Sequence, residues 1–334
     1  MTTAAQDVGP DRLTLTAFAA LILMVGINAN AVKATVNELA PMWSAGLRFS
    51  AAALILGAVV LIGRQPLPRG RALAGTVLFG GLSFAGFFAF GYWGIQRLPV
   101  SVAAVLFASV PLVTFVAAVL HRLEPFRWRT LAGGLLAVAG IAVMSGGPGS
   151  SSLSVPGLLA LLVAAVCAAE AAVIAKRFPP VPPLVMNAVG MTIGAAILLG
   201  LSFASGEAHT APTEAATWLG LGYLVLFGSI ATFITYLFVL RRWTATGTSY
   251  EFVLAPLVAV IFAALFQGER ITGGLVAGGA LVLAGVYVGA LLHIDKAEAK
   301  VPEPRPEPAA AVAASEGEAR PELAGVPADC LRCP

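Results

Sequence analysis

Long apolar segments follow one another through most of this chain, and they limit what it can fold into. A helix needs about 20 apolar residues to cross the hydrocarbon core of a bilayer. Only 11% of the 334 residues are charged, against about 25% in soluble proteins. The sequence therefore predicts an all-α membrane protein with ten transmembrane helices. These ten segments lie at about 13–31, 42–62, 72–93, 99–120, 130–146, 155–175, 183–203, 217–240, 246–267 and 273–293.

Basic residues are unevenly divided between the two sides of these predicted helices. If the N-terminus is inside, the cytoplasmic segments carry 13 Lys and Arg residues, and the outer segments carry only Lys33, Arg97 and Arg270. Cytoplasmic loops of membrane proteins are enriched in Lys and Arg. We therefore expect a multi-pass protein of the cell inner membrane, with both termini in the cytoplasm and lipid around it.

The composition changes after about residue 295. Residues 295–334 are rich in Ala, Pro and Glu and contain almost no large apolar residues, which predicts a disordered cytoplasmic tail. Cys330 and Cys333 form a single Cys-x-x-Cys without a second Cys or His pair, so the sequence predicts no metal site there. The net charge of +3 is small and scattered, which argues against a nucleic-acid partner.

An internal repeat divides the rest of the chain. Several residues recur at a fixed offset of 145: Arg97 and Arg242, Pro111 and Pro256, Glu124 and Glu269, and Gly133, Gly134 and Gly140 with Gly278, Gly279 and Gly285. This offset spans five predicted helices, and because five is odd, equivalent residues face opposite sides of the membrane. We therefore expect two inverted five-helix repeats, 1–150 and 151–294, a design that secondary transporters use. A duplication that serves only packing is the alternative.

Two stretches resemble a known family. Residues 223–242, YLVLFGSIATFITYLFVLRR, are similar to the eighth helix of EamA-type transporters of the drug/metabolite transporter superfamily, and 250–272, YEFVLAPLVAVIFAALFQGERIT, to their ninth. Lys33 and Arg48 also resemble the family pattern, whereas the first-half copy has His121-Arg122-Leu123-Glu124 in place of the usual Gly-Glu. The resemblance implies ten helices in two inverted halves and export of amino acids, drugs or other metabolites.

Ionisable residues inside the predicted helices are the first candidates for function, because charges in lipid are costly and usually face a cavity or a partner. Arg48 is either a structural anchor or a clamp for a substrate carboxylate. Glu170 and Glu251 are candidate cation or proton sites, with Glu170 preferred because it is slightly deeper in sequence. The alternative for both is snorkelling to the interface or pairing with a nearby base.

Neutral polar and aromatic residues complete the candidate pathway. Hydroxyl groups recur along one face of the eighth helix, and aromatic side chains recur along the third, where an interfacial belt is the commoner explanation. Pro111 and Pro256, each within a helix, are candidate hinges. The remaining pathway candidates are Asn28, Phe88, Tyr92, Ser229, Thr232, Tyr236 and Tyr250.

Catalytic, nucleotide-binding and metal-binding motifs do not occur in the sequence, so we expect neither an enzyme nor a cofactor. The sequence favours a secondary transporter that exports small amphipathic metabolites, with amino acids preferred on family resemblance, by alternating access. A membrane binding or scaffold protein without transport activity is the alternative. Small-residue faces at Gly274-x-x-x-Gly278 and Gly285-x-x-x-Gly289 suit either a scaffold within the chain or a homodimer.

Overall fold

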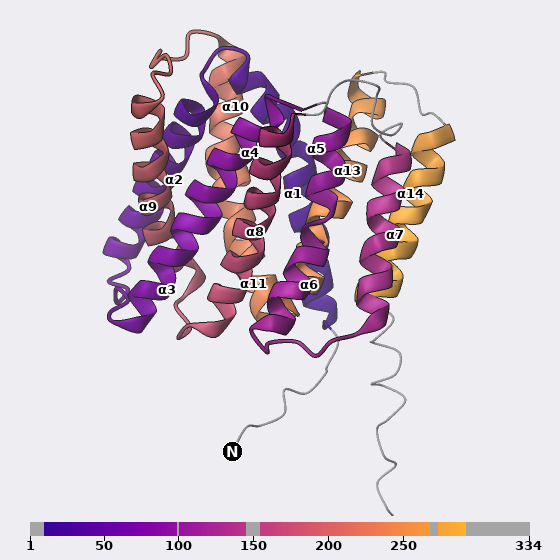
Figure 1. Ribbon diagram of the computed structural model, residues 1–334. Helices are drawn as coiled ribbons and strands as arrows, with labels where there is room; N and C mark the ends of the chain where they lie inside the picture. Colours follow the sequence, from indigo (N-terminus) through magenta and orange to yellow (C-terminus); the bar gives the residue numbers. More distant parts are fainter. Residues whose placement is uncertain (1–9, 99, 145–153, 268–272, 292–334) are drawn as a thin grey trace, which may run out of the picture. The chain divides into compact units, whose positions relative to one another are not determined.

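The computed structural model describes residues 10–98, 100–144, 154–267 and 273–291, which belong to one compact unit. Within these ranges the chain is helical and has no strand (Figure 1). The first helices are α1 (Arg12–Val36), α2 (Pro41–Ile62), α3 (Arg71–Gly80), the π-helical turn η1 (Gly81–Gly86), α4 (Phe87–Ile95), α5 (Val100–Ala108), α6 (Val110–Leu120) and α7 (Trp128–Met144). There follow α8 (Val155–Arg177), α9 (Pro183–Ala204), α10 (Ala215–Val225), the π-helical turn η2 (Leu226–Ala231), α11 (Thr232–Arg242), α12 (Ala245–Ser249), α13 (Glu251–Gln267), α14 (Gly273–Val286) and the π-helical turn η3 (Tyr287–Leu291).

Local chemistry sets where several helices begin. The side chain of Asp11 accepts a hydrogen bond from the Thr14 backbone N–H at 3.0 Å, which caps α1. Ser154 caps α8 in the same way, and both are residue types that favour this position. Prolines occupy the first turns of α2, α6, α8 and α9, where the missing N–H has no helical partner to lose.

Many of these helices can cross a membrane. In the described part of the chain, seven helical segments are long and apolar enough to do so, and two shorter apolar helices accompany them. The prediction of an all-helical membrane protein is confirmed to this extent. The seven are Arg12–Val36, Pro41–Ile62, Arg71–Ile95, Val102–Leu120, Val155–Arg177, Pro183–Ala204 and Ala215–Arg242, and the shorter two are Trp128–Val143 and Val276–Ala290.

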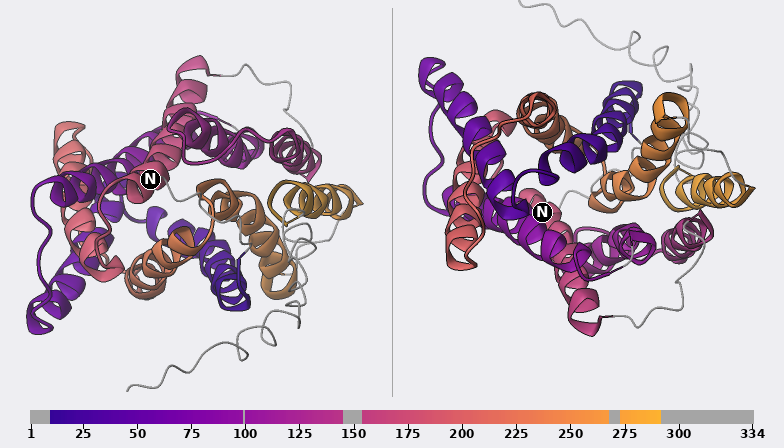
Figure 2. Two further views of the ribbon diagram at one scale, coloured as in Figure 1. Left: turned by 90° about the horizontal axis from the view of Figure 1, so that it is seen from below. Right: turned by 90° about the horizontal axis from the view of Figure 1, so that it is seen from above.

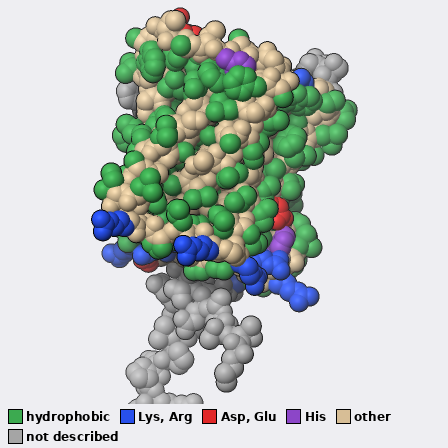
Figure 3. Space-filling model, turned by 90° about the vertical axis from the view of Figure 1, so that its left-hand side faces the viewer, with side chains coloured by type: hydrophobic (Ala, Val, Ile, Leu, Met, Phe, Trp, Pro, Cys, Tyr) green, Lys and Arg blue, Asp and Glu red, His purple; other side chains and the backbone are tan. Residues whose placement is uncertain are grey.

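The outer surface is apolar around its middle and basic at one end. Leu54, Ile62 and Leu219 are each at least 75% exposed, which lipid tolerates and water does not favour. Figure 3 shows hydrophobic side chains covering the side of the molecule and Lys and Arg side chains gathered at its lower end. We call this the basic end. It carries Arg64, Arg69 and Arg71 in the α2–α3 loop and at the start of α3, Arg122, Arg127 and Arg129 in the α6–α7 loop and at the start of α7, and Lys176, Arg177, Arg241 and Arg242 at the ends of α8 and α11.

Helix packing follows a paired pattern. α2 packs along α9 at one edge of the bundle, and α7 packs along α14 at the other, as both figures show (Figures 1 and 2). α1 contacts α10, α11 and α13, and α8 contacts α3, α4 and α6 in the corresponding way. The main contacts of α1 and of α8 therefore follow a similar pattern.

Glycines let α7 and α14 approach closely. A Cβ atom on Gly140 would lie 2.7 Å from the Val282 backbone N and 2.8 Å from the Gly278 backbone O. Gly133 faces Gly289 and the carbonyl of Gly285 just as closely. The small residues of the second Gly-x-x-x-Gly face therefore pack inside the chain, which is the scaffold role rather than a dimer surface.

Two π-helical turns occupy matching places. η1 interrupts the long helical segment Arg71–Ile95, and η2 interrupts Ala215–Arg242. Gly81–Gly86 and Leu226–Ala231 are separated by the same 145 residues as the sequence repeat. Turns of this kind are rare and are common at functional sites. Their spacing of 145 residues is a regularity of the helices that the structure describes.

The two candidate hinge prolines differ in their surroundings. Pro111 lies in the first turn of α6, directly after a break at Ser109 that separates α5 from α6. Its ring lacks the N–H that would continue α5. Pro256 lies inside α13, which continues through it. The expected interruption therefore ends a helix at Pro111, whereas the helix remains continuous at Pro256.

Two glutamates join loops at the end opposite the basic end. Glu207, in the loop before α10, accepts hydrogen bonds from the backbone N–H groups of Met42 and Trp43, at 3.2 and 2.9 Å, in the first turn of α2. Glu38, in the loop before α2, accepts hydrogen bonds from the backbone N–H of Thr213 at 2.5 Å and that of Glu214 at 3.3 Å, just before α10. We call this exchange the carboxylate clasp. It satisfies helix-start N–H groups that have no helical partner.

Candidate functional site

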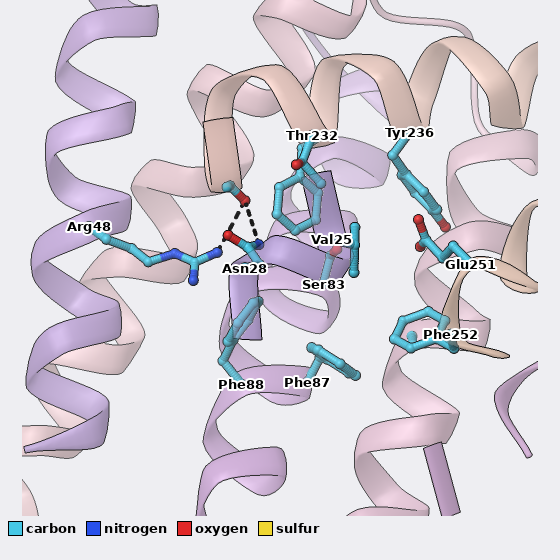
Figure 4. Close-up of a pocket in the computed structure, with 13 residues that line it drawn as sticks. Val25, Asn28, Arg48, Ser83, Phe87, Phe88, Thr232, Tyr236, Glu251 and Phe252 are labelled. Atoms are coloured by element: carbon cyan, nitrogen blue, oxygen red, sulfur yellow. Dashed lines mark hydrogen bonds between the residues drawn. The ribbon is translucent and has the colours of Figure 1, made fainter. Parts of the chain in front are cut away.

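A pocket lies inside the bundle, and residues of η1 and η2 line it together with residues of α1, α2, α4, α8, α11 and α13. Its volume is about 100 Å³, well under the roughly 300–1,000 Å³ of drug-sized sites. Polar groups and phenylalanine rings share its walls (Figure 4). The lining residues are Val25, Asn28, Arg48, Ser83, Phe87, Phe88, Ala168, Gly228, Thr232, Phe233, Tyr236, Glu251 and Phe252.

Arg48 brings a positive charge to this pocket from α2. Its side chain is only 2% exposed. Nε donates to Ser229 Oγ at 3.1 Å and Nη2 donates to the Gly228 carbonyl at 3.3 Å. The guanidinium also lies over the rings of Phe49 and Phe88, at 4.5 and 5.0 Å from their centroids. No carboxylate in the described ranges lies within ion-pairing distance of it.

The carbonyl of Gly228 is available because of the π-helical turn. Thr232 Oγ1 donates to the Phe227 carbonyl at 2.7 Å, five residues earlier, as suits the wider turn of η2. Gly228 O then accepts hydrogen bonds from Arg48 and, at 3.5 Å, from Asn28 Nδ2 (Figure 4). Freed carbonyls at membrane depth need partners of this kind. η2 thereby fixes Arg48 and Asn28 at the pocket wall.

Glu251 brings a carboxyl group to the opposite wall. It is the first residue of α13 and is 6% exposed. Its Oε2 atom has no hydrogen-bond partner among the described residues, and none of the basic residues placed by the structure pairs with it. Figure 4 shows its carboxylate beside the tip of Tyr236, across the pocket from Arg48. The pocket therefore contains a buried guanidinium and a buried carboxyl group that do not pair with each other.

The structure brings most of the sequence-derived candidates together. Asn28, Arg48, Phe88, Thr232, Tyr236 and Glu251 line the pocket. Ser229 holds Arg48 from behind, and Tyr92 packs against Phe88 with ring centroids 5.8 Å apart. Phe84, on the same face as Phe88, is fully buried, so these aromatics do not form a belt that faces lipid.

Two candidates lie elsewhere. Glu170 is half-buried on α8, with Oε2 3.7 Å from His121 Nε2, and is not part of the pocket lining. Tyr250 is fully buried, and its hydroxyl lies against Gly289, outside the lining. The sequence-based preference for Glu170 over Glu251 therefore gains no support from the geometry.

Sequence reasoning did not select Ser83, Phe87, Phe233 or Gly228. The signal that identifies them is the repeat itself. At the offset of 145, Ser83 corresponds to Gly228, Phe87 to Thr232 and Phe88 to Phe233, and all six line the pocket. Phe252, also not selected, directly follows Glu251 at the start of α13.

A second hollow, on the side of the bundle, differs in chemistry. Its volume is about 640 Å³, and it lies between α2, α4, α8 and α9. Residues such as Phe90, Leu159 and Ile197 line it, and it has no charged side chain. Lipid chains suit such a surface. The polar groups that can recognise a solute are in the smaller, central pocket.

Comparison with known proteins identifies the family. The model of the EamA-like transporter family matches residues 13–146 and again 155–290. The chain belongs to the EamA-like transporter family. As an EamA-like protein it is a multi-pass inner-membrane transporter.

Individual relatives of this EamA-like chain carry related names. An uncharacterized inner membrane transporter, YedA, of Escherichia coli K12 is 31% identical over 76% of this chain and 82% of the relative. A probable terminal-alkyne amino-acid exporter of Streptantibioticus cattleyicolor is 27% identical over 80% and 91%. A probable amino-acid metabolite efflux pump of Salmonella typhimurium LT2 is 26% identical over 81% and 93%.

A solved structure shares the EamA-like fold. It matches with a TM-score of 0.72 and 24% identity, over 84% of this chain and 98% of the other. At that identity the likeness concerns the fold.

Proposed function

We propose that this transporter is a secondary exporter of small amphipathic metabolites, amino acids above all, and that it works by alternating access. The observation that carries this proposal is the central pocket. It combines phenylalanine walls with buried groups of both charges, and such a lining suits a solute with an apolar part and polar ends. Two relatives named for amino-acid export support the choice of amino acids.

Alternating access requires two halves that can exchange conformations. We assign ten helices to two inverted five-helix repeats, 1–150 and 151–294. The double match of the family model, the matching π-helical turns and the paired helix contacts support this division. Pro111 and Pro256 are the proposed hinges, at equivalent positions beside the pathway. Glu269, the second-half partner of Glu124, lies outside the described residues.

The orientation follows from charge. The basic end is assigned to the cytoplasm, because Lys and Arg are concentrated on that side of membrane proteins. The first residue of α1 and the last described residues after α14 lie at this end (Figure 1). Both termini are therefore placed in the cytoplasm. The tail 295–334, with Cys330 and Cys333, lies outside the described residues and remains a prediction from composition.

Flux through sealed proteoliposomes tests the proposal. Purified protein is expected to move a labelled amino acid such as leucine, whereas a scaffold would bind a partner without flux of any solute. Glu251→Gln is expected to lower the initial rate about tenfold, because hydrogen bonds to a charged group contribute about 1.5–3 kcal/mol. Glu170→Gln is expected to lower it far less, since Glu170 lies beside His121.

Glu214→Gln, a change at an exposed position before α10, is the matched control and is expected to keep the rate of the unaltered protein. Equal losses in the variants of Glu170 and Glu251 would show that the pathway is not confined to the pocket described here. An absence of flux for a broad panel of solutes would overturn the transport proposal.

A further inference from the structure

Two buried ionisable side chains, Arg48 and Glu251, line the central pocket, and neither has an ion-pair partner in the described part of the chain. An isolated buried charge is costly unless it is paired. Arg48 and Glu251 also do not pair with each other, although both face the same pocket. Helix packing alone does not explain why Arg48 and Glu251 are buried without a partner, so we look for a role in binding.

The Arg48 guanidinium is fixed in place and still has N–H groups available for further hydrogen bonds. A guanidinium has five N–H donors in a fixed fork, and the structure assigns only two donations, to Ser229 and Gly228. The rings of Phe49 and Phe88 fix its plane. A carboxylate is the group that such a preorganised fork binds best.

Glu251 is the complementary acceptor. Its Oε2 is buried without a partner, and the start of α13 gives it partial compensation through the positive end of the helix dipole. Asn28 Oδ1 is a second buried acceptor without a partner in the same pocket. The Glu251 atom suits an ammonium group, which has three N–H donors and no acceptor, whereas Asn28 lies beside Arg48 at the other wall.

The repeat indicates that these charges do not serve the scaffold. Counted from the prolines that begin α2 and α9, Arg48 corresponds to Gly190, and at the offset of 145, Glu251 corresponds to Leu106. Both counterparts are uncharged. The polar recognition groups are therefore asymmetric within a nearly symmetric frame, and they give the pocket a positive and a negative wall.

We propose that the pocket binds a zwitterion, with its carboxylate at Arg48, its ammonium at Glu251 and its apolar part between Val25, Phe87 and Phe252. The small volume of about 100 Å³ suits a solute of amino-acid size. This assignment rests on the proposed transport function and adds that both charged ends of the solute are recognised, by separate walls.

The test measures binding to the purified full-length protein by thermal shift and by displacement of labelled ligand. The probes are zwitterions (leucine, phenylalanine, 4-aminobutanoate and 6-aminohexanoate) and two analogues of leucine. 4-Methylpentanoate lacks the ammonium, and 3-methylbutan-1-amine lacks the carboxylate. At least one zwitterion is expected to bind, and, for leucine, the loss of either end is expected to weaken binding about tenfold or more.

Variants assign each end to its wall. In Arg48→Gln, leucine and 3-methylbutan-1-amine are expected to bind equally, because the carboxylate has lost its partner. In Glu251→Gln, leucine and 4-methylpentanoate are expected to bind equally. Arg69→Gln and Glu214→Gln, at exposed loop positions, are expected to keep the preferences of the unaltered protein. If a variant does not fold, the comparison of probes on the unaltered protein still decides whether both ends are read.

Equal binding of leucine and a singly charged analogue to the unaltered protein would overturn the assignment. So would flux of a solute without both charges when no zwitterion binds, although the transport proposal would survive that result. Zwitterion binding without flux in sealed vesicles would leave the pocket assignment standing and overturn the transport proposal.

Discussion

At the scale of single residues, carboxyl groups occupy two different environments in this protein. Glu251 is buried and unpaired in the pocket. Glu38 lies in a loop at the end of the bundle and accepts three hydrogen bonds, from Thr213 N, Thr213 Oγ1 and Glu214 N. The hydrogen bonds from Thr213 lower the pKa of Glu38 from 4.5 to about 2. Those donors favour the ionised form.

This lowered pKa predicts an acid-sensitive contribution to stability. A carboxyl group whose pKa is lower in the folded state stabilises the fold fully above its ordinary pKa and loses that contribution as the pH falls through the folded value. Glu38→Gln is therefore expected to lower the midpoint of thermal unfolding in detergent at pH 7, and the difference is expected to shrink between pH 4.5 and about pH 2.

Glu214→Gln provides the comparison, because only the backbone N–H of Glu214 takes part in the clasp. It is expected to unfold like the unaltered protein at each pH. A difference between Glu38→Gln and the unaltered protein that stays constant down to pH 2.5 would contradict the assigned protonation.

At the scale of helices, two kinds of local feature shape the pathway. The π-helical turns η1 and η2 each bring a residue, Ser83 and Gly228, to the pocket wall. Glycines allow the α7–α14 contact, where backbones meet directly. The π-helical turns therefore shape the pocket wall, and the glycines allow the close packing of the helices around it.

The glycine contact gives a measurable prediction. Gly140→Ala is expected to destabilise the protein by about 1–3 kcal/mol, because overpacking of a tight contact forces backbone shifts, and the atoms nearest to the new Cβ are backbone N and O. Gly200→Ala is the control, since nothing lies within 4 Å of a Cβ there. Thermal unfolding of both variants in detergent measures the difference, and equal midpoints would show that α7 and α14 separate at little cost.

Some helices and candidates could be predicted from sequence for clear physical reasons. Apolar length identified spans such as Pro183–Ala204, because the requirement for a bilayer helix is simple. Burial of charge identified Arg48 and Glu251. The distance of Glu170 and Glu251 from the ends of their predicted helices did not indicate which of them lines the pocket. The side of a helix that faces the pocket depends on packing between helices. The π-helical turns could not be predicted either, because no residue pattern indicates them.

At the scale of the whole molecule, the carboxylate clasp joins the proposed halves at the end opposite the basic end. Glu38 and Met42 belong to the first half, and Glu207 and Thr213 belong to the second. Trp43 adds a hydrogen bond from Nε1 to the Thr210 carbonyl at 2.9 Å. Opening of the pocket towards this end by separation of the halves would break these contacts.

Cross-linking across the clasp tests this movement. Met42→Cys and Ala208→Cys, which leave Glu207 in place, are joined by a membrane-impermeant bifunctional thiol reagent added to intact cells, in a background without Cys167, Cys330 and Cys333. Export is expected to stop on cross-linking and to return after reduction, whereas either single-cysteine protein is expected to be unaffected. Undiminished export by the cross-linked protein would mean that the halves do not part here.

The clasp also constrains how such a protein can be rebuilt. Each of its two loops supplies a glutamate that accepts hydrogen bonds from N–H groups at the start of the helix that follows the other loop. Neither helix start is therefore satisfied by its own loop alone. A chimera that takes only the α1–α2 loop from a relative lacking Glu38 would leave the N–H groups of Thr213 and Glu214, at the start of α10, without their acceptor. The α1–α2 and α9–α10 loops therefore have to be replaced together, both in evolution and in protein engineering.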